Sequence, residues 1–114
     1  MAKKSDSKAK TSKEPGVANG VRVKEIQIDV GSITTSQELH ELLKNELSFP
    51  EYYGKNWAAF WDTITSLVLL PEVIIFKNWG KMEKLLPEDC SELLYLLKDI
   101  GIKFPGWAGV VKFI

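Results

Sequence analysis

The sequence predicts a single α/β domain in which helices pack on a three-stranded parallel sheet. Three segments with strand-like patterns, 23–30, 73–76 and 110–114, are separated by stretches with the periodicity of amphipathic helices. Strands that alternate with helices pair in parallel through right-handed crossovers. A chain of 114 residues is large enough to bury the core of one such layered domain.

A change of period defines the first strand and the first helix. Apolar and polar residues alternate from Val23 to Val30, which is typical of a strand, and Gly31 ends it. Thr35 and Glu38 have the spacing of a capping box, and leucines at helical intervals then predict a helix of about eleven residues. His40 lies off the leucine stripe. It lacks the companions that a metal site needs, so we expect it to face solvent or to interact with a helix cap.

The stretch from Phe49 to Leu67, FPEYYGKNWAAFWDTITSL, is the part of the chain densest in aromatic residues. Pro50 cannot continue the preceding helix, Gly54 supplies a flexible corner, and Asn56 is a good N-cap. A second helix is therefore predicted to begin near Trp57. Its apolar stripe consists of Trp57, Phe60, Trp61, Ile64, Leu67 and Val68, and the residues off this stripe are Asp62, Thr63, Thr65 and Ser66.

Aromatic residues at helical spacing belong more often to the core than to a recognition surface. Both tryptophans of this helix, together with Phe60 and two adjacent tyrosines, would fill a large share of a small interior. We therefore expect at least one tyrosine or tryptophan to lie at the surface beside Asp62. An exposed aromatic ring next to a carboxylate is typical of a protein-binding hot spot.

The second half of the chain predicts two more strands. Pro71 precedes the run from Val73 to Phe76, whose β-branched and apolar residues are typical of a strand covered on both faces. A turn at residues 78–80 and a short helix from Met82 to Leu86 follow. The final strand is expected from Val110 to Ile114.

A longer helix is predicted between these two strands. It begins at Pro87 and ends at Gly101, because proline favours the first helical position and glycine the position after the last. Cys90 belongs to its apolar face and is expected to be a buried, inert thiol. Residues 104–109, FPGWAG, read as a loop.

The overall charge conceals a split between the two parts of the chain. Residues 1–20 carry five lysines and two acids (+3), whereas residues 21–114 carry ten basic and thirteen acidic residues (−3). We expect the lysine-rich segment 1–20 to be a disordered, solvated arm and residues 21–114 to form the domain. An acidic body favours a cationic partner over nucleic acid as the direct ligand.

Several classes of protein are disfavoured by what the sequence lacks. A single cysteine excludes an internal disulfide and a cysteine-based metal cluster. Apolar runs are too short for a membrane span or a signal peptide, so we expect a cytoplasmic protein. The sequence contains no phosphate-binding loop, no nucleophile beside a histidine and no suitably spaced pair of carboxylates, which are the features that would indicate an enzyme. A recognition protein without catalytic residues, metal or cofactor remains.

The segment FPEYYGKNWAAFWDTIT resembles the signature of the barstar family, intracellular inhibitors of secreted bacterial ribonucleases. Weaker likeness extends from Ile26 to Ile114. The resemblance implies the same α/β fold. It also implies that a tight loop and the helix after it plug the active site of the enzyme. The positions that match in unbroken register are Pro50, Glu51, Tyr52, Tyr53, Gly54, Asn56, Trp61, Asp62 and Thr65.

The resemblance implies a role for each matching position. Asp62 corresponds to the carboxylate that stands in for a substrate phosphate. We also expect it to lie in the first turn of its helix, where the helix dipole stabilises a negative charge. Tyr52 corresponds to a tyrosine that packs on the enzyme's catalytic histidine, and Gly54 to a corner where backbone approaches the partner. The remaining predicted contacts are Asn56, Trp57, Trp61, Thr65 and Ser66, with Trp57 an additional aromatic at the loop exit.

The sequence also departs from the family pattern. Ala58 stands in place of a second carboxylate, Leu67 in place of an aromatic contact, and Ser66 in place of a glycine. Residues 94–99 contain no unambiguous match for a further acidic contact. We therefore expect weaker inhibition of the usual ribonuclease, or a different toxin with fewer cationic pockets.

These observations predict an inhibitor of a ribonuclease or of another cationic toxin protein, monomeric before it binds. The alternative is a barstar-fold interaction module that has lost ribonuclease binding and binds a different protein, which the missing acids favour. A third reading is a nucleic-acid binder that combines the lysine arm with exposed tryptophans.

Overall fold

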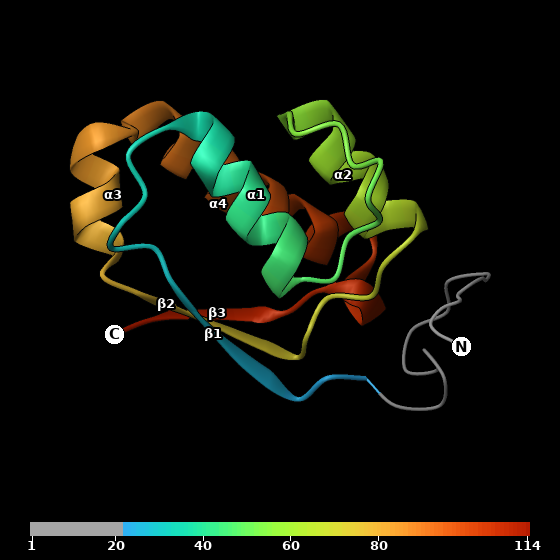
Figure 1. Ribbon diagram of the computed structural model, residues 1–114. Coiled ribbons are helices and arrows are strands. Elements are labelled where there is room, and N and C mark those ends of the chain that lie inside the picture. Colours follow the sequence, from blue (N-terminus) through green and yellow to red (C-terminus); the bar gives the residue numbers. More distant parts are fainter. Residues whose placement is uncertain (1–21) are drawn as a thin grey trace.

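The computed structural model describes residues 22–114, which form the predicted α/β fold with a three-stranded parallel sheet. The sheet has the order β1 (Glu25–Asp29), β2 (Val73–Lys77) and β3 (Val110–Phe113). The helices all lie on one side of this sheet (Figure 1). The arm predicted at residues 1–20 lies outside the described residues.

Four helices and one short 3-10 turn connect the strands. Helix α4 contacts α2, α3 and the 3-10 turn η3, and so links the elements of the helical layer. The bounds are α1 (Ser36–Glu46), α2 (Trp57–Ser66), α3 (Trp79–Leu85), α4 (Pro87–Lys103) and η3 (Pro105–Trp107).

Helix α1 begins at the predicted cap and has the predicted length of eleven residues. The Thr35 hydroxyl accepts a hydrogen bond from the Glu38 N–H at 3.1 Å. The Glu38 carboxylate accepts from the N–H of Thr34 at 2.8 Å, one residue before the usual donor of a capping box. The bonds from Thr34 lower the pKa of Glu38, because they stabilise its charged form.

Helix α3 begins earlier than the sequence predicts. Asn78 adopts a left-handed conformation (φ 62°), and the helix starts at the next residue, Trp79, inside the predicted turn. The Asn78 side chain donates to Asp29 Oδ1 at 2.9 Å. This bond fixes the corner to the end of β1, which local propensity does not reveal.

Helix α4 begins at Pro87 as predicted but continues past Gly101 to Lys103. A Cβ atom at Gly101 would lie 3.3 Å from the Cβ of Ala108, so this glycine serves close packing against the following segment. Cys90 is 1% exposed, and burial raises the pKa of its thiol to about 11. The prediction of a buried thiol is confirmed.

The core lies between the sheet and the helices. Ile74 and Phe76 of β2 point into it and are each 1% exposed, whereas Ile75 points to the other face and is 8% exposed. The helices complete the core with fully buried side chains, among them Leu39, Leu43, Phe60, Ile64, Leu93 and Ile100.

Two glycines provide a matched test of this packing. A Cβ at Gly109 would lie 2.5 Å from the backbone oxygen of Pro71, whereas nothing lies within 4 Å of a Cβ at Gly80. Gly109→Ala should therefore lower the free energy of unfolding by about 1–3 kcal/mol, because the start of β3 has to shift. Gly80→Ala, in α3, should raise it by up to about 1 kcal/mol. Urea unfolding of both variants checks the pair, and equal midpoints would contradict it.

Candidate functional site

Residues 48–56 form the loop that connects α1 to α2, called here the 48–56 loop. Ser48 leaves α1 in a left-handed conformation (φ 60°), and the N–H of Phe49 then donates to the Lys44 carbonyl at 2.9 Å. The Phe49 ring is buried and meets the Tyr53 ring edge-on, with centroids 4.9 Å apart. The loop therefore starts from a fixed point on the core.

Lys55 is a second left-handed residue of this loop (φ 56°), next to Gly54, the predicted flexible corner, whose own φ is not left-handed. The small size of Gly54 matters for packing, because a Cβ there would lie 3.2 Å from the Cβ of Ala59. Without a side chain, the exposed backbone at Gly54 lies close to the first turn of α2.

Ion pairs attach both arms of the loop to α1. Lys44 Nζ lies 3.0 Å from Glu51 Oε1 and 3.7 Å from Glu41 Oε2, and Lys55 Nζ lies 2.6 Å from Glu41 Oε1. The Lys44 side chain is only 10% exposed. Its hydrogen bond to Glu51 raises the Lys44 pKa, while the bond from Lys55 lowers the pKa of Glu41. Both shifts favour the charged forms that hold the loop.

Asn56 caps α2 as predicted. Its Oδ1 accepts a hydrogen bond from the Ala59 N–H at 2.7 Å, and the helix begins at Trp57. The first turn contains no acidic residue, so the first-turn position predicted for Asp62 is wrong. Asp62 lies in the second turn, where the helix dipole contributes little because its effect falls off within one turn.

The predicted contact residues of α2 occupy two neighbouring stripes at a spacing of four residues. Ala58, Asp62 and Ser66 are exposed. Trp57, Trp61 and Thr65 are half-buried. Residues four apart share a face of a helix, so the carboxylate of Asp62 is flanked by a stripe that carries two indole rings.

The buried side of α2 differs from the predicted stripe at Thr63 and at Leu67. Thr63 is 4% exposed and its hydroxyl donates to the Ala59 carbonyl at 2.7 Å, which satisfies the buried polar group. Leu67, predicted on the apolar stripe, is 49% exposed just beyond the helix. The face that meets the core is therefore Phe60, Thr63 and Ile64.

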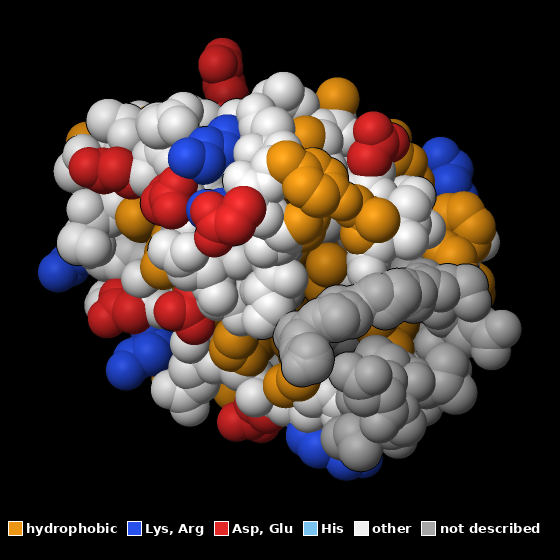
Figure 2. Space-filling view, turned by 45° about the vertical axis from the view of Figure 1, so that its right-hand side comes forward, with side chains coloured by type: hydrophobic (Ala, Val, Ile, Leu, Met, Phe, Trp, Pro, Cys, Tyr) orange, Lys and Arg blue, Asp and Glu red, His pale blue; other side chains and the backbone are white. Residues whose placement is uncertain are grey.

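The two adjacent tyrosines of the loop point in different directions. Tyr52 is 76% exposed, whereas Tyr53 is 5% exposed. This divides the aromatic cluster as expected, with one tyrosine at the surface and the other in the core. Figure 2 is turned toward the side of the 48–56 loop and α2, and hydrophobic side chains gather there with charged groups at the border.

Lys103 connects Trp61 to a carboxylate that the sequence did not assign, that of Asp99. Lys103 Nζ is 5.5 Å from the centroid of a Trp61 ring and 3.0 Å from Asp99 Oδ2. Lys103 therefore joins the indole of α2 to the Asp99 carboxylate of α4, whose side chain is 14% exposed. The spacing of Asp99 and Lys103 fits a helical ion pair, but only the packing of α4 on α2 places them at this surface.

His40 is buried, so the prediction that it faces solvent is wrong. It is 1% exposed, and its Nδ1 lies 2.6 Å from the Tyr53 hydroxyl. Its ring also contacts Trp57, with centroids 4.3 Å apart. The aromatic segment returns over α1 and covers a position that the leucine stripe alone leaves outside the core.

Asp89 extends these contacts to α4. Trp57 Nε1 donates to Asp89 Oδ1 at 2.9 Å, and the Ser36 hydroxyl donates to the same oxygen at 3.3 Å. The half-buried Trp57 is therefore fixed by its polar edge as well as by its ring contacts. Its predicted role as a partner contact concerns only the part of the ring that solvent reaches.

Within residues 22–114, no group of three or more His, Cys, Asp or Glu side chains is placed to hold a metal ion. No helix among the described residues is long and apolar enough to cross a membrane.

The fold agrees with what comparisons with known proteins find. Residues 23–109 match the family described as barstar (barnase inhibitor). A protein of Bacillus subtilis (strain 168) named "Putative ribonuclease inhibitor YrdF" is 32% identical over 77 residues, which cover 68% of this chain and 85% of that protein. The chain belongs to the barstar family. Its members are inhibitors and not enzymes, in agreement with the non-enzymatic class expected from the sequence.

The cap of α2 can be tested by its effect on stability. Asn56→Ala removes the side-chain acceptor of the Ala59 N–H and should lower the free energy of unfolding by about 1 kcal/mol. Asn45→Ala is the control, because Asn45 is exposed inside α1 and alanine there should be neutral or slightly stabilising. Equal urea midpoints for the parent and Asn56→Ala would contradict the capping role.

Proposed function

We propose that the protein inhibits a ribonuclease by inserting the 48–56 loop and the outward stripes of α2 into the enzyme's active site. The observation that carries this proposal is the exposure of Tyr52 and Asp62 on one rigidly attached segment, in register with the family signature. The segment is rigid because α1 holds it through the buried Tyr53 and the ion pairs of Lys44.

Asp62 is the proposed mimic of a substrate phosphate. Its exposed carboxylate can accept charge-assisted hydrogen bonds from arginine and lysine side chains that otherwise bind RNA. Asp99, beside Trp61, adds a second negative group at the same surface once Lys103 moves aside. The excess of acids in residues 21–114, thirteen against ten basic residues, would speed the encounter with a cationic enzyme.

The remaining contacts would shape the fit. Tyr52 presents a ring that can stack on an imidazole of the enzyme, and the exposed backbone at Gly54 permits close approach. The half-buried rings of Trp57 and Trp61 supply apolar area beside Asp62. The polar groups of Asn56, Thr65 and Ser66 would lie at the margin, where hydrogen bonds give specificity.

The proposed inhibitor acts in the cytoplasm in an antitoxin role. It acts as a monomer, because a plug has to enter the cleft of its target as a single copy. A second candidate function is that of an interaction module for a protein other than a ribonuclease. Ala58 favours this candidate, since it lies exposed on the same stripe as Asp62 and offers no carboxylate. A partner with fewer cationic pockets would suit that surface.

The proposal predicts that single substitutions weaken inhibition without unfolding the domain. Asp62→Ala should weaken the inhibition of barnase by at least about thirtyfold, because truncating one partner of a buried charge pair costs about 2–5 kcal/mol. Tyr52→Ala should weaken it as well through lost stacking. The measurement is a titration of RNA cleavage, with the heat of binding followed in parallel.

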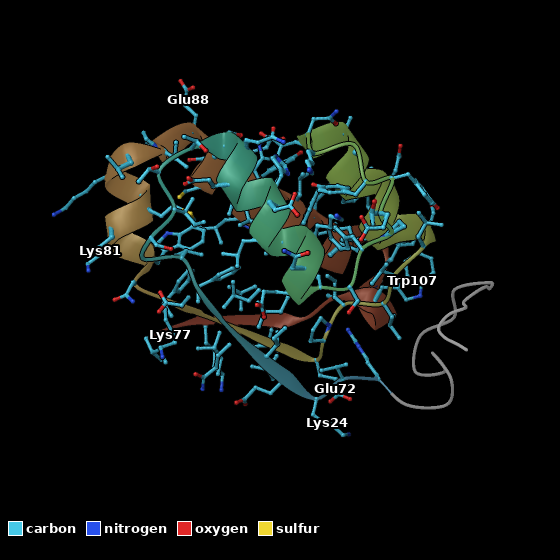
Figure 3. The ribbon with its side chains drawn as sticks, viewed as in Figure 1. Lys24, Glu72, Lys77, Lys81, Glu88 and Trp107 are labelled. Atoms are coloured by element: carbon cyan, nitrogen blue, oxygen red, sulfur yellow. The ribbon has the colours of Figure 1, made fainter. Side chains whose placement is uncertain are left out.

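Glu88→Ala provides the matched control, because it removes one negative charge from the exposed start of α4, away from α2 (Figure 3). Its inhibition constant should equal that of the parent. Inhibition that persists unchanged in the Asp62→Ala, Tyr52→Ala double variant would overturn the assigned site. A parent protein that leaves barnase active at micromolar concentrations would favour the interaction module instead.

A further inference from the structure

The contact between His40 and Tyr53 joins a buried residue of α1 to the exposed part of the 48–56 loop. Both side chains are buried, at 1% and 5% exposure, and 2.6 Å separates the imidazole Nδ1 from the hydroxyl oxygen. This distance is short for a neutral pair. Tyr53 directly follows Tyr52, so the position of the buried ring also sets the backbone from which the exposed ring projects.

The direction of this hydrogen bond follows from the second acceptor near the hydroxyl. Tyr53 has one hydroxyl proton, which can point to His40 Nδ1 at 2.6 Å or to the Asn56 carbonyl at 3.5 Å. The shorter distance and a neutral imidazole favour donation to Nδ1. Burial raises the pKa of Tyr53, so its hydroxyl keeps this proton.

We propose that His40 is a positioning residue of the partner-binding loop, whose neutral imidazole accepts the Tyr53 hydroxyl hydrogen bond and thereby holds Tyr52 in its outward position. This inference rests on the proposed function for the identity of the loop's partner. The loop geometry itself can be tested without that partner. His40 would not touch the partner, since it is buried beneath Tyr53 and Trp57.

The surroundings of His40 provide little to stabilise a protonated ring. The 48–56 loop presents the Tyr53 hydroxyl, α2 presents the uncharged Trp57 indole, and α4 presents the carboxylate of Asp89. That carboxylate already accepts hydrogen bonds from Trp57 and Ser36. No ion pair to His40 exists among residues 22–114.

Acid should therefore loosen the loop. Burial lowers the pKa of His40 from its ordinary 6.5, and the charge of Asp89 opposes this only in part. Because the unfolded or opened form binds a proton more readily, the closed form is fully favoured above pH 6.5 and loses stability as the pH falls below it. Protonation also takes away the lone pair of Nδ1, so the bond from Tyr53 cannot form in the same direction.

The test measures amide hydrogen exchange in the free protein and dissociation from barnase as the probe. Tyr53→Phe removes the hydroxyl and leaves the ring, so the protection factor of the Tyr53 N–H, which donates to the Pro50 carbonyl at 3.0 Å, should fall about tenfold. The rate of dissociation from barnase should rise by a similar factor. Tyr95→Phe is the matched control, since Tyr95 is 61% exposed on α4, and it should change neither quantity.

The pH profile separates positioning from general stability. In the parent, the same protection factor should be constant well above pH 6.5 and should fall as the pH decreases below it, because there the opened form binds a proton and the closed form does not. His40→Asn retains an acceptor without a titrating ring, so it should keep part of the protection and lose the pH dependence. If the variant Tyr53→Phe does not fold, His40→Asn alone carries this comparison.

The outcomes distinguish this inference from the proposed function. Unchanged loop protection in Tyr53→Phe, or an identical pH profile in the parent and His40→Asn, would overturn the positioning role of His40. A parent that fails to bind barnase would overturn the ribonuclease assignment, while the exchange data would still decide whether His40 orders the loop.

Discussion

The surface proposed for recognition depends on how α1 holds the 48–56 loop. Two attachments act at different depths: the hydrogen bond between Tyr53 and His40 in the core, and the ion pair between Lys44 and Glu51 at the loop's first arm. The outer pair alone would contribute little to stability, because its Glu51 carboxylate is 95% exposed and is screened by water. The buried bond is different, since loss of either partner leaves a desolvated polar group. Buried residues therefore fix the position of the exposed Tyr52 ring.

Much of the fold could be predicted from local patterns. The three strands, the capped helix α1, the Asn56 cap and the proline start of α4 each follow from residues close together in the sequence. The differences occur where a distant residue decides the local structure. Asn78 is held by Asp29, which starts α3 early, and Ala108 lies against Gly101, which lies inside α4 rather than at its end. Neither contact has a signal within a short window.

The candidate site shows the same division. The exposure of Asp62 could be predicted because it lies off the apolar stripe, and that of one tyrosine because a small domain cannot bury so many rings. His40 could not, because its burial depends on the loop folding back over α1. Asp99 reaches the surface near Trp61 only through the packing of α4 on α2. Periodicity reports which face a residue occupies on its own helix and not which element covers that face.

Ala58 stands where the family pattern has a carboxylate, and this makes the attachment of the 48–56 loop to α1 more important for the proposed affinity. A surface with fewer charged contacts gains less from each encounter, so its affinity depends more on how little order has to be created upon binding. The 48–56 loop meets that requirement with side chains already fixed by the core: Phe49, Tyr53 and the capping Asn56 are all bonded or packed within the protein itself. In the proposed complex, a loop ordered in this way would allow Asp62 to act as the one principal acid, because little order has to be created on binding. In this proposal, the order that α1 imposes on the free loop offsets the affinity lost through the reduced charge on α2.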